Sequence, residues 1–149
     1  MEIPQSIREL IAKAPLAHLT TLNSDGSPQV TVIWVGIENE EFVIAHLALH
    51  KKVKNIRRDP RVALSMLGDK INANGMREYL VVHGNARVTE GGAVDLLGRL
   101  APLYLGPGSC LPAARHAQHS RIRHPNHTEA LHRDRAVGWA SCRVRRRVM

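Results

Sequence analysis

The sequence predicts a mainly β protein, an antiparallel barrel with small helices added at its edges. Several short segments alternate apolar and polar residues at period two, or are rich in β-branched residues, as strands are. The sequences NSDGS and ENEE lie between such segments and are typical of turns, so neighbouring strands are expected to join as hairpins. A chain of 149 residues is long enough for one domain with its own core.

The first elements are a helix, a strand, a turn and a second strand. Residues 3–13 are expected to be helical because their apolar side chains share one face. Residues 16–22 alternate as a strand, and the NSDGS turn leads into a second strand over residues 28–35, which contains VTVIWV. Gly26 accepts the positive φ that a tight hairpin turn requires.

The middle of the chain continues with a strand, a helix and another strand. Residues 41–47 (EFVIAHL) are expected to form the third strand, and residues 51–58 a short helix. Asp59-Pro60 ends this helix, because the residue before a proline avoids the helical region. Residues 61–67 (RVALSML) then form the fourth strand.

The last elements of the predicted barrel are a long strand and a helix. A polar connection over residues 68–75 precedes the fifth strand, residues 78–88, in which Gly84 indicates a bulge or a close backbone approach. After a Gly-Gly break, residues 93–105 place leucines at helical spacing. Five strands joined by hairpins, with helices at the edges, give the predicted antiparallel barrel.

The charge of the chain is unevenly distributed. The net charge is +8, which by itself would suggest a nucleic-acid-binding protein. Up to Gly108, however, 12 Lys and Arg face 11 Asp and Glu, a net charge of only +1. From Ser109 onward nine Arg face only Glu129 and Asp134, a net charge of +7. The balanced body argues against nucleic acid as a partner.

Compartment and membrane signals are few. No apolar run approaches the roughly 18 residues that cross a membrane, and the start MEIPQSIREL does not read as a secretory signal. Cys110 and Cys142 make neither a metal-ligand spacing nor a disulfide framework. A cytoplasmic protein without a resident metal is therefore expected.

The segment that carries chemical information begins the predicted helix after the FVIAHL strand. Lys51 and Lys52 stand in the first turn of that helix, where exposed amides and two ammonium groups together attract an anion. Hydrogen bonds from lysine to phosphate are charge-assisted and strong. Taken alone, the segment is more simply interpreted as a solvated basic helix face.

Four segments in this order resemble a known family. They are DGSPQVTVIWV, FVIAHL, KKVKNIRRDPRVAL and YLVVHGNARV, and the most specific is the spacing K-x-x-N-x-x-x-D-P-R from Lys52 to Arg61. Over roughly residues 5–107 the chain resembles the pyridoxamine 5'-phosphate oxidase superfamily of split β-barrel flavoproteins. The greatest similarity is to its actinobacterial branch, which uses the deazaflavin coenzyme F-420. The resemblance implies an FMN-binding type of split barrel over residues 1–108.

The resemblance also implies where a cofactor would lie. The second strand would lie along the isoalloxazine ring and ribityl chain, the end of the third strand on the phosphate side, and the lysine pair on the phosphate. A polar residue of the long strand would reach the cofactor, and residues further along the helix would hold a polyglutamate tail. The implied cofactor-binding residues are Thr31, Val32, Ile33, Trp34, Ala45, His46, Lys51, Lys52, Lys54, Asn55, Arg58 and Tyr79.

Structural roles remain open for some of these residues. Thr31, Ile33 and Tyr79 are equally compatible with sheet packing. His46 and His83 are more simply interpreted as hydrogen-bonded strand residues than as catalysts. No catalytic residue is identified from the sequence, which shows no catalytic triad, metal cluster or phosphate-binding glycine loop.

The activity that the resemblance implies is an oxidoreductase reaction. Hydride would pass between reduced coenzyme F-420 and a small activated acceptor such as an enone or a quinone, while the protein supplies binding, orientation and a dry pocket. A homodimer with the cofactor at the subunit interface is implied. The alternatives are an FMN-binding pyridoxamine 5'-phosphate oxidase-like protein, a non-catalytic flavin- or haem-binding module, and a basic nucleic-acid-binding protein.

Residues 109–149 form an Arg- and His-rich tail unlike the family's C-terminus. Codons for residues 110–137 can be chosen so that a reading shifted by one base includes G-Y-V-T-R-I-T-P and ends in G-P-W, as family members do. We therefore hypothesise a frameshifted C-terminus, natural or from a sequencing error, which would remove the last barrel strand. The alternative is a natural basic tail. One intact reading frame through codons 105–115, on resequencing and comparison with relatives, would contradict the hypothesis.

Overall fold

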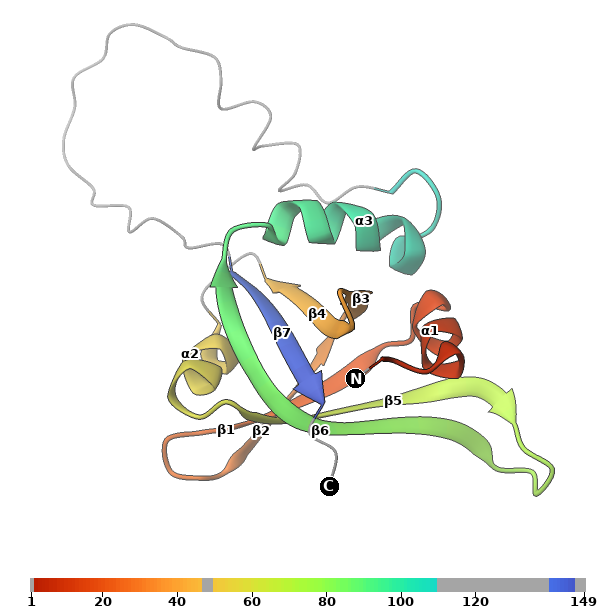
Figure 1. The fold of residues 1–149 in the computed structure, drawn as a ribbon, viewed down its shortest axis with the longest axis horizontal. Coiled ribbons are helices and arrows are strands. Elements are labelled where there is room, and N and C mark those ends of the chain that lie inside the picture. Colours follow the sequence, from red (N-terminus) through yellow and green to blue (C-terminus); the bar gives the residue numbers. More distant parts are fainter. Residues whose placement is uncertain (1, 47–49, 110–139, 147–149) are drawn as a thin grey trace, which may run out of the picture.

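The computed structural model describes residues 2–46, 50–109 and 140–146, and within these ranges the fold is mainly β, as expected. Seven described strands form one antiparallel sheet, flanked by three helices (Figure 1). In chain order the elements are α1 (Gln5–Ala12), β1 (Ala17–Leu22), β2 (Pro28–Ile33), β3 (Gly36–Glu38), β4 (Glu41–His46), α2 (Lys51–Arg58), β5 (Arg61–Ile71), β6 (Arg77–Glu90), α3 (Ala93–Leu105) and β7 (Ala140–Arg146).

The order of strands in the sheet is β2-β1-β5-β6-β7-β4-β3. The strands β2 and β3 follow each other in the chain but lie at opposite ends of this order. No described pairing joins them, so the sheet curls into a split barrel without closing. The long hairpin of β5 and β6 projects from the body of the molecule (Figure 1).

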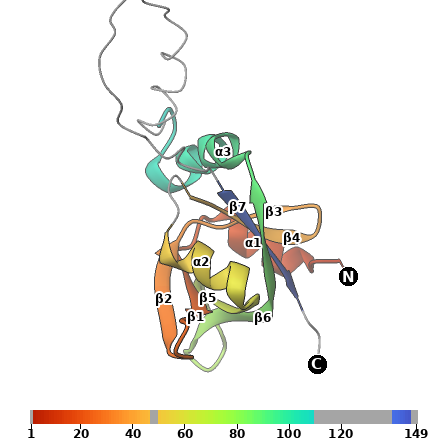
Figure 2. The same cartoon turned by 90° about the vertical axis from the view of Figure 1, so that its left-hand side faces the viewer.

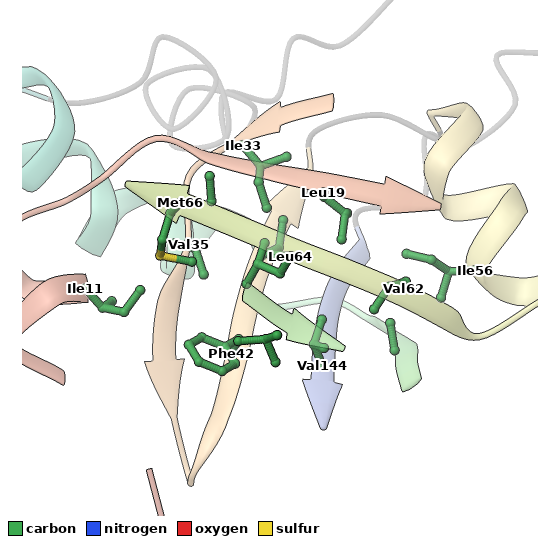
Figure 3. Close-up of a cluster of buried hydrophobic side chains, with 14 of the residues drawn as sticks. Ile11, Leu19, Ile33, Val35, Phe42, Ile56, Val62, Leu64, Met66 and Val144 are labelled. Carbon is green, nitrogen blue, oxygen red and sulfur yellow. The ribbon is translucent and has the colours of Figure 1, made fainter. Parts of the chain in front are cut away.

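The main core fills the concave side of the curled sheet. Leu19, Leu64 and Ile44, from three different strands, are completely buried there. Figure 3 shows their neighbours converging from the helices and from opposite walls of the sheet. The other labelled members of this cluster are Ile11, Ile33, Val35, Phe42, Ile56, Val62, Met66 and Val144.

Strand β4 is buried on both faces, which explains its nearly continuous apolar sequence. Phe42 and Ile44 point into the main core, whereas Val43 packs on the other side against Leu96 and Leu100 of α3. A strand covered on both sides has no polar face and so loses the alternating pattern. The helix α3 thereby covers the end of the sheet where β4 runs toward α2 (Figure 1).

Helix α2 packs against β1 and β6 with one face (Figure 2). Val53 and Ile56 supply its apolar contacts and are almost fully buried. The residue before Pro60 is extended, with φ −134° and ψ 109°, so the helix ends at Arg58 as expected.

Three local predictions differ from the structure. The strand β5 continues to Ile71 through residues expected to form a polar loop, because it pairs with β6 in an exposed two-stranded arm. The bulge expected at Gly84 is wrong, since Gly84 pairs regularly with Val62, and the irregularity lies between Leu67 and Ile71. The short strand β3 was not expected, because three residues carry too little pattern.

The last strand also differs from expectation. β7 pairs with β4 on one side and β6 on the other, so the described sheet includes a strand from the C-terminal tail. Val144 of β7 is completely buried in the main core. Most of the tail on which the frameshift hypothesis rests, residues 110–139, lies outside the described residues.

Candidate functional site

A cavity of about 350 Å³ opens between the end of β2, the end of β4, the start of α2 and the middle of α3. Residues from β4, from the start of α2 and from α3 meet here with the end of β2. Six residues singled out from the sequence line this cavity, together with Leu16, His50 and Leu97: Val32, Ile33, Trp34, Ala45, His46 and Lys52.

One end of the cavity carries positive charge. Lys52 is only 7% exposed, an uncommon environment for a lysine, and belongs to the first turn of α2. The residue before the helix, His50, is the N-cap and makes no side-chain hydrogen bond to the first turn. The helix N-terminus and Lys52 therefore add their positive potentials at this end.

His46 lies at the same end and is 6% exposed. Among the described residues its Nε2 has no hydrogen-bond partner, which is unusual for a buried polar atom. Burial, followed by the charges of Lys52 and His50, lowers the pKa of His46 from 6.5 to about 3. The imidazole is thus neutral near pH 7, and His50 meets it edge-on with ring centroids 6.0 Å apart.

The lining of the cavity away from Lys52 and the two histidines is apolar. Trp34 is half-buried and stacks on Tyr104, with ring centroids 5.0 Å apart and planes 9° from parallel. Leu16 and Val32, each 57% exposed, line the same region, and Leu97 of α3 closes it from behind. A planar aromatic group with an anionic tail matches this division into apolar and cationic ends.

Several predicted residues stand outside the cavity. Thr31 is half-buried in β2, and its hydroxyl lies 3.5 Å from the carbonyl oxygen of Leu19, a long hydrogen bond. Lys51, Lys54 and Arg58 are exposed on α2. The guanidinium of Arg58 also donates to the carbonyl oxygen of Leu22.

Asn55, one of the predicted cofactor-binding residues, is buried and hydrogen-bonded inside the protein. It is 2% exposed, and its amide nitrogen lies 2.9–3.1 Å from acceptors on Thr21, Asn23 and Gln29. Its carbonyl oxygen accepts from Arg58 at 3.3 Å. Because both polar atoms are engaged inside the protein, Asn55 fastens α2 to the β1–β2 hairpin and does not present its amide to a ligand.

Tyr79 also lies elsewhere in the isolated chain. It is 73% exposed on the β5–β6 arm and lines a separate cavity of about 480 Å³ beside α1. Within one chain Tyr79 therefore does not line the first cavity, and its contact with a cofactor stays a prediction.

Sequence reasoning missed four residues of the site. Leu16 and Leu97 have the ordinary pattern of strand and helix residues, and Tyr104 follows Leu97 by two helical turns. His50 had a usable signal, because it immediately precedes the lysine pair. In the described part of the chain no group of His, Cys, Asp or Glu is arranged to hold a metal, and no helix there is long and apolar enough to cross a membrane.

Comparison with known proteins relates this geometry to a family. The family model of pyridoxamine 5'-phosphate oxidase matches residues 3–104. No curated protein matches the sequence significantly.

Among solved structures, an F-420 reductase is similar over 98% of this chain and 97% of its own, with 22% identity and a TM-score of 0.66. A conserved hypothetical protein from Mycobacterium tuberculosis is similar over 99% of this chain and 82% of its own, with 20% identity and a TM-score of 0.66. A haem storage protein from Vibrio cholerae is similar over 100% and 93%, with 15% identity and a TM-score of 0.61. At these identities the likeness shows the shared fold.

Proposed function

The chain belongs to the pyridoxamine 5'-phosphate oxidase family, and from this premise we propose that it is an oxidoreductase that binds the deazaflavin coenzyme F-420. The hydride acceptor is a small activated molecule such as an enone or a quinone. One observation carries the proposal: the end of β2, the end of β4 and the start of α2 converge on a single cavity with an apolar and a cationic end.

The cationic end suits the cofactor's phosphate. Lys52 is buried at the cavity wall, and the N-terminus of α2 lies at the cavity because the N-cap His50 lines it too. His46 offers a neutral nitrogen that has no partner among the described residues. A phosphate oxygen bound here would receive one charge-assisted hydrogen bond from Lys52 and one from the imidazole or an amide.

The apolar end suits the cofactor's ring system. Trp34, Val32 and Leu97 would keep water from the ring and hold it in one plane. When bound, the reduced cofactor supplies a hydride, two electrons with one proton, to the electron-poor carbon of the acceptor, and solvent supplies the proton that completes the reduction. The protein's own residues bind and orient, so no acid–base pair is required.

The exposed face of α2 supports coenzyme F-420 over FMN as the cofactor. Lys51, Lys54 and Arg58 are exposed on the helix that also carries Lys52. A polyglutamate tail leaving the phosphate would pass these three cations, whereas FMN has no such tail. Asn55 is not part of this surface, because it is buried beneath it.

A second copy of the chain is the proposed partner. The convex side of β2, β1, β5 and β6, here called the outer face, carries large apolar side chains that are exposed: Leu16, Val30, Val32, Leu67, Tyr79 and Val81. Leu16 and Val32 also line the cavity, so a copy seated on the outer face would border the cofactor site. The outer face also carries Tyr79, which a homodimer would place at the subunit interface.

Two alternatives share the same cavity. FMN would use the ring and phosphate positions and leave the exposed cations of α2 unused. Haem is favoured by one observation, the buried and neutral His46, whose Nε2 has no hydrogen-bond partner in the described part of the chain and is competent to ligate iron. In that case the protein would be a binding module.

Titration of the purified protein with coenzyme F-420, FMN and haem tests the proposal. We expect coenzyme F-420 to bind most tightly, as measured by cofactor fluorescence, and we expect its affinity to rise with the number of glutamates in its tail. Tighter binding of FMN would overturn the choice of cofactor. A strong Soret band with no consumption of reduced cofactor in the presence of menadione or cyclohexenone would favour the haem module.

A further inference from the structure

Tyr104 supports the tryptophan of the cavity from the outside. The two rings are stacked at 5.0 Å and 9°. Trp34 lines the cavity, whereas Tyr104 does not. The phenol ring therefore covers the face of the indole that is turned away from the cavity.

The hydroxyl of Tyr104 ties together two separate segments. It accepts a hydrogen bond from the N–H of Val35 at 3.0 Å. Its own proton is shared between the carbonyl oxygens of Pro15 at 3.0 Å and Val35 at 3.1 Å. Pro15 immediately precedes Leu16, and Val35 immediately follows Trp34, so the hydroxyl holds the backbone next to two residues of the cavity wall.

We propose that Tyr104 is a positioning residue that fixes the plane of Trp34 and its separation from Leu16, and so sets the width of the slot that receives the flat ring of the cofactor. The part of this inference that concerns the ring rests on the proposed function. The part that concerns Trp34 does not.

The helix that carries Tyr104 is well placed to act as a rigid support. Leu96 and Leu100 pack against Val43 of β4, and Leu97 lines the cavity itself. Leu96, Leu97 and Leu100 are all less than 10% exposed, so α3 is anchored along its length. Burial also raises the pKa of the Tyr104 phenol, which keeps its proton available at neutral pH.

The test uses Trp34 as its own reporter. In the full chain with Trp139→Phe, Trp34 is the only tryptophan. Tyr104→Phe keeps the stacked ring and removes the hydroxyl, and Tyr104→Leu removes both. Leu105→Ala, at an exposed neighbour on the same helix, is the matched control. Thermal unfolding identifies the variants that fold.

Two measurements are made on each folded variant. Without cofactor, acrylamide quenching of Trp34 fluorescence is expected to rise in the order parent, Tyr104→Phe, Tyr104→Leu, with Leu105→Ala at the parent value. The dissociation constant of riboflavin, a ring without phosphate, is expected to rise about three- to tenfold in Tyr104→Leu, the range that an aromatic stack is worth. Binding of inorganic phosphate is expected to be unchanged, which a general loosening of the protein would not allow.

The outcomes separate this inference from the proposed function. Unchanged quenching in a folded Tyr104→Phe and Tyr104→Leu would overturn it, as would altered quenching with unchanged riboflavin affinity, or equal losses for riboflavin and phosphate. If the parent protein binds no flavin or deazaflavin while quenching follows the expected order, the proposed function fails and the positioning of Trp34 stands.

Discussion

At the scale of single residues, the spacing K-x-x-N-x-x-x-D-P-R divides between ligand and structural roles. Lys52 faces the cavity, whereas Asn55 joins α2 to the hairpin. Asp59 is paired with Arg61 at 2.6 Å, and hydrogen bonds from Arg61 lower the pKa of its carboxyl to about 2. The motif therefore contains residues that attach α2 to the sheet as well as a residue that lines the cavity.

Substitutions of the two lysines at the start of α2 are expected to weaken cofactor binding by different amounts. Lys52→Ala is expected to weaken cofactor binding by about 1.5–3 kcal/mol, the value of a hydrogen bond to a charged group. Lys51→Ala should cost about 0–1 kcal/mol, because an exposed charge is screened by water. Fluorescence titrations of both variants at one salt concentration compare them. Equal losses, or none for Lys52→Ala, would mean that the phosphate lies elsewhere.

Because His46 is buried and neutral, the folded protein is expected to lose stability in acid. The pKa of His46 is lowered to about 3 in the folded protein, against 6.5 for an exposed histidine, so protons bind preferentially to the unfolded chain. The contribution of neutral His46 to the free energy of unfolding is fully present above about pH 6.5. It is lost as the pH falls toward 3, at up to about 1.4 kcal/mol per pH unit.

Urea unfolding of the wild type and of His46→Gln between pH 3.5 and 8 measures this loss. We expect the wild type to lose more stability than the variant below pH 6.5, and the difference between them to be constant above pH 7. His18→Gln, at an exposed position of β1 away from His46, should follow the wild type. Parallel curves for the wild type and His46→Gln would contradict the assignment.

Substitution of Asn55 is expected to destabilise the protein. Asn55→Ala would leave the polar groups of Thr21, Asn23 and Gln29 without their donor in a buried place. The expected cost is about 1–3 kcal/mol in the free energy of unfolding. Lys54→Ala, its exposed neighbour, should change stability by less than about 0.5 kcal/mol. Chemical denaturation compares the two, and equal stabilities would rule out the proposed anchor.

At the scale of elements, α3 contains an interior glycine that lowers the stability of the helix. Gly98 lies on the exposed side of its interior, and an added Cβ would meet nothing within 4 Å. Gly98→Ala is therefore expected to stabilise the protein by about 0.5–1 kcal/mol. Gly92→Ala, at the N-cap with φ +71°, should instead destabilise it by about 1–2 kcal/mol. Opposite shifts in the midpoint of thermal unfolding are expected, and shifts of the same sign would contradict the argument.

The helices and most strands could be predicted because their patterns are local. Helix α2 runs from Lys51 to Arg58 as expected, since a proline fixes its end. The extension of β5 to Ile71 could not be predicted, because both faces of the arm are exposed and an exposed pair of strands has no alternation to detect.

At the scale of the whole molecule, the outer face predicts self-association. Val81→Glu would place a charge in the middle of this face, where Val81 is 46% exposed. We expect the wild type to be a dimer by light scattering and the variant to be a monomer that is still folded. Leu105→Glu, on α3, should remain a dimer. A monomeric wild type would overturn the proposed partner.

The position of the C-terminal strand β7 in the sheet bears on the frameshift hypothesis. β7 lies between β4 and β6, a position that either reading frame must fill for the sheet to hold together. The residues as written do so with Val144 buried and with Arg143 bonded to Glu38 at 2.9 Å. The frameshift remains our proposal for residues from Ser109 onward, with resequencing of the gene as its test.

The sequence by itself determined the fold class and the helix start with its lysine pair, because these features depend on periodicity, turn residues and the local spacing of charges. Six of the residues that line the cavity were implied by the resemblance to the family and not by such local patterns. Only the tertiary structure decided that Asn55 is an anchor, that Tyr79 stands apart from the cavity, and that Tyr104 supports Trp34. The physical reason is the same in each case, because burial and hydrogen-bond partners come from segments distant in the chain, which no local pattern encodes.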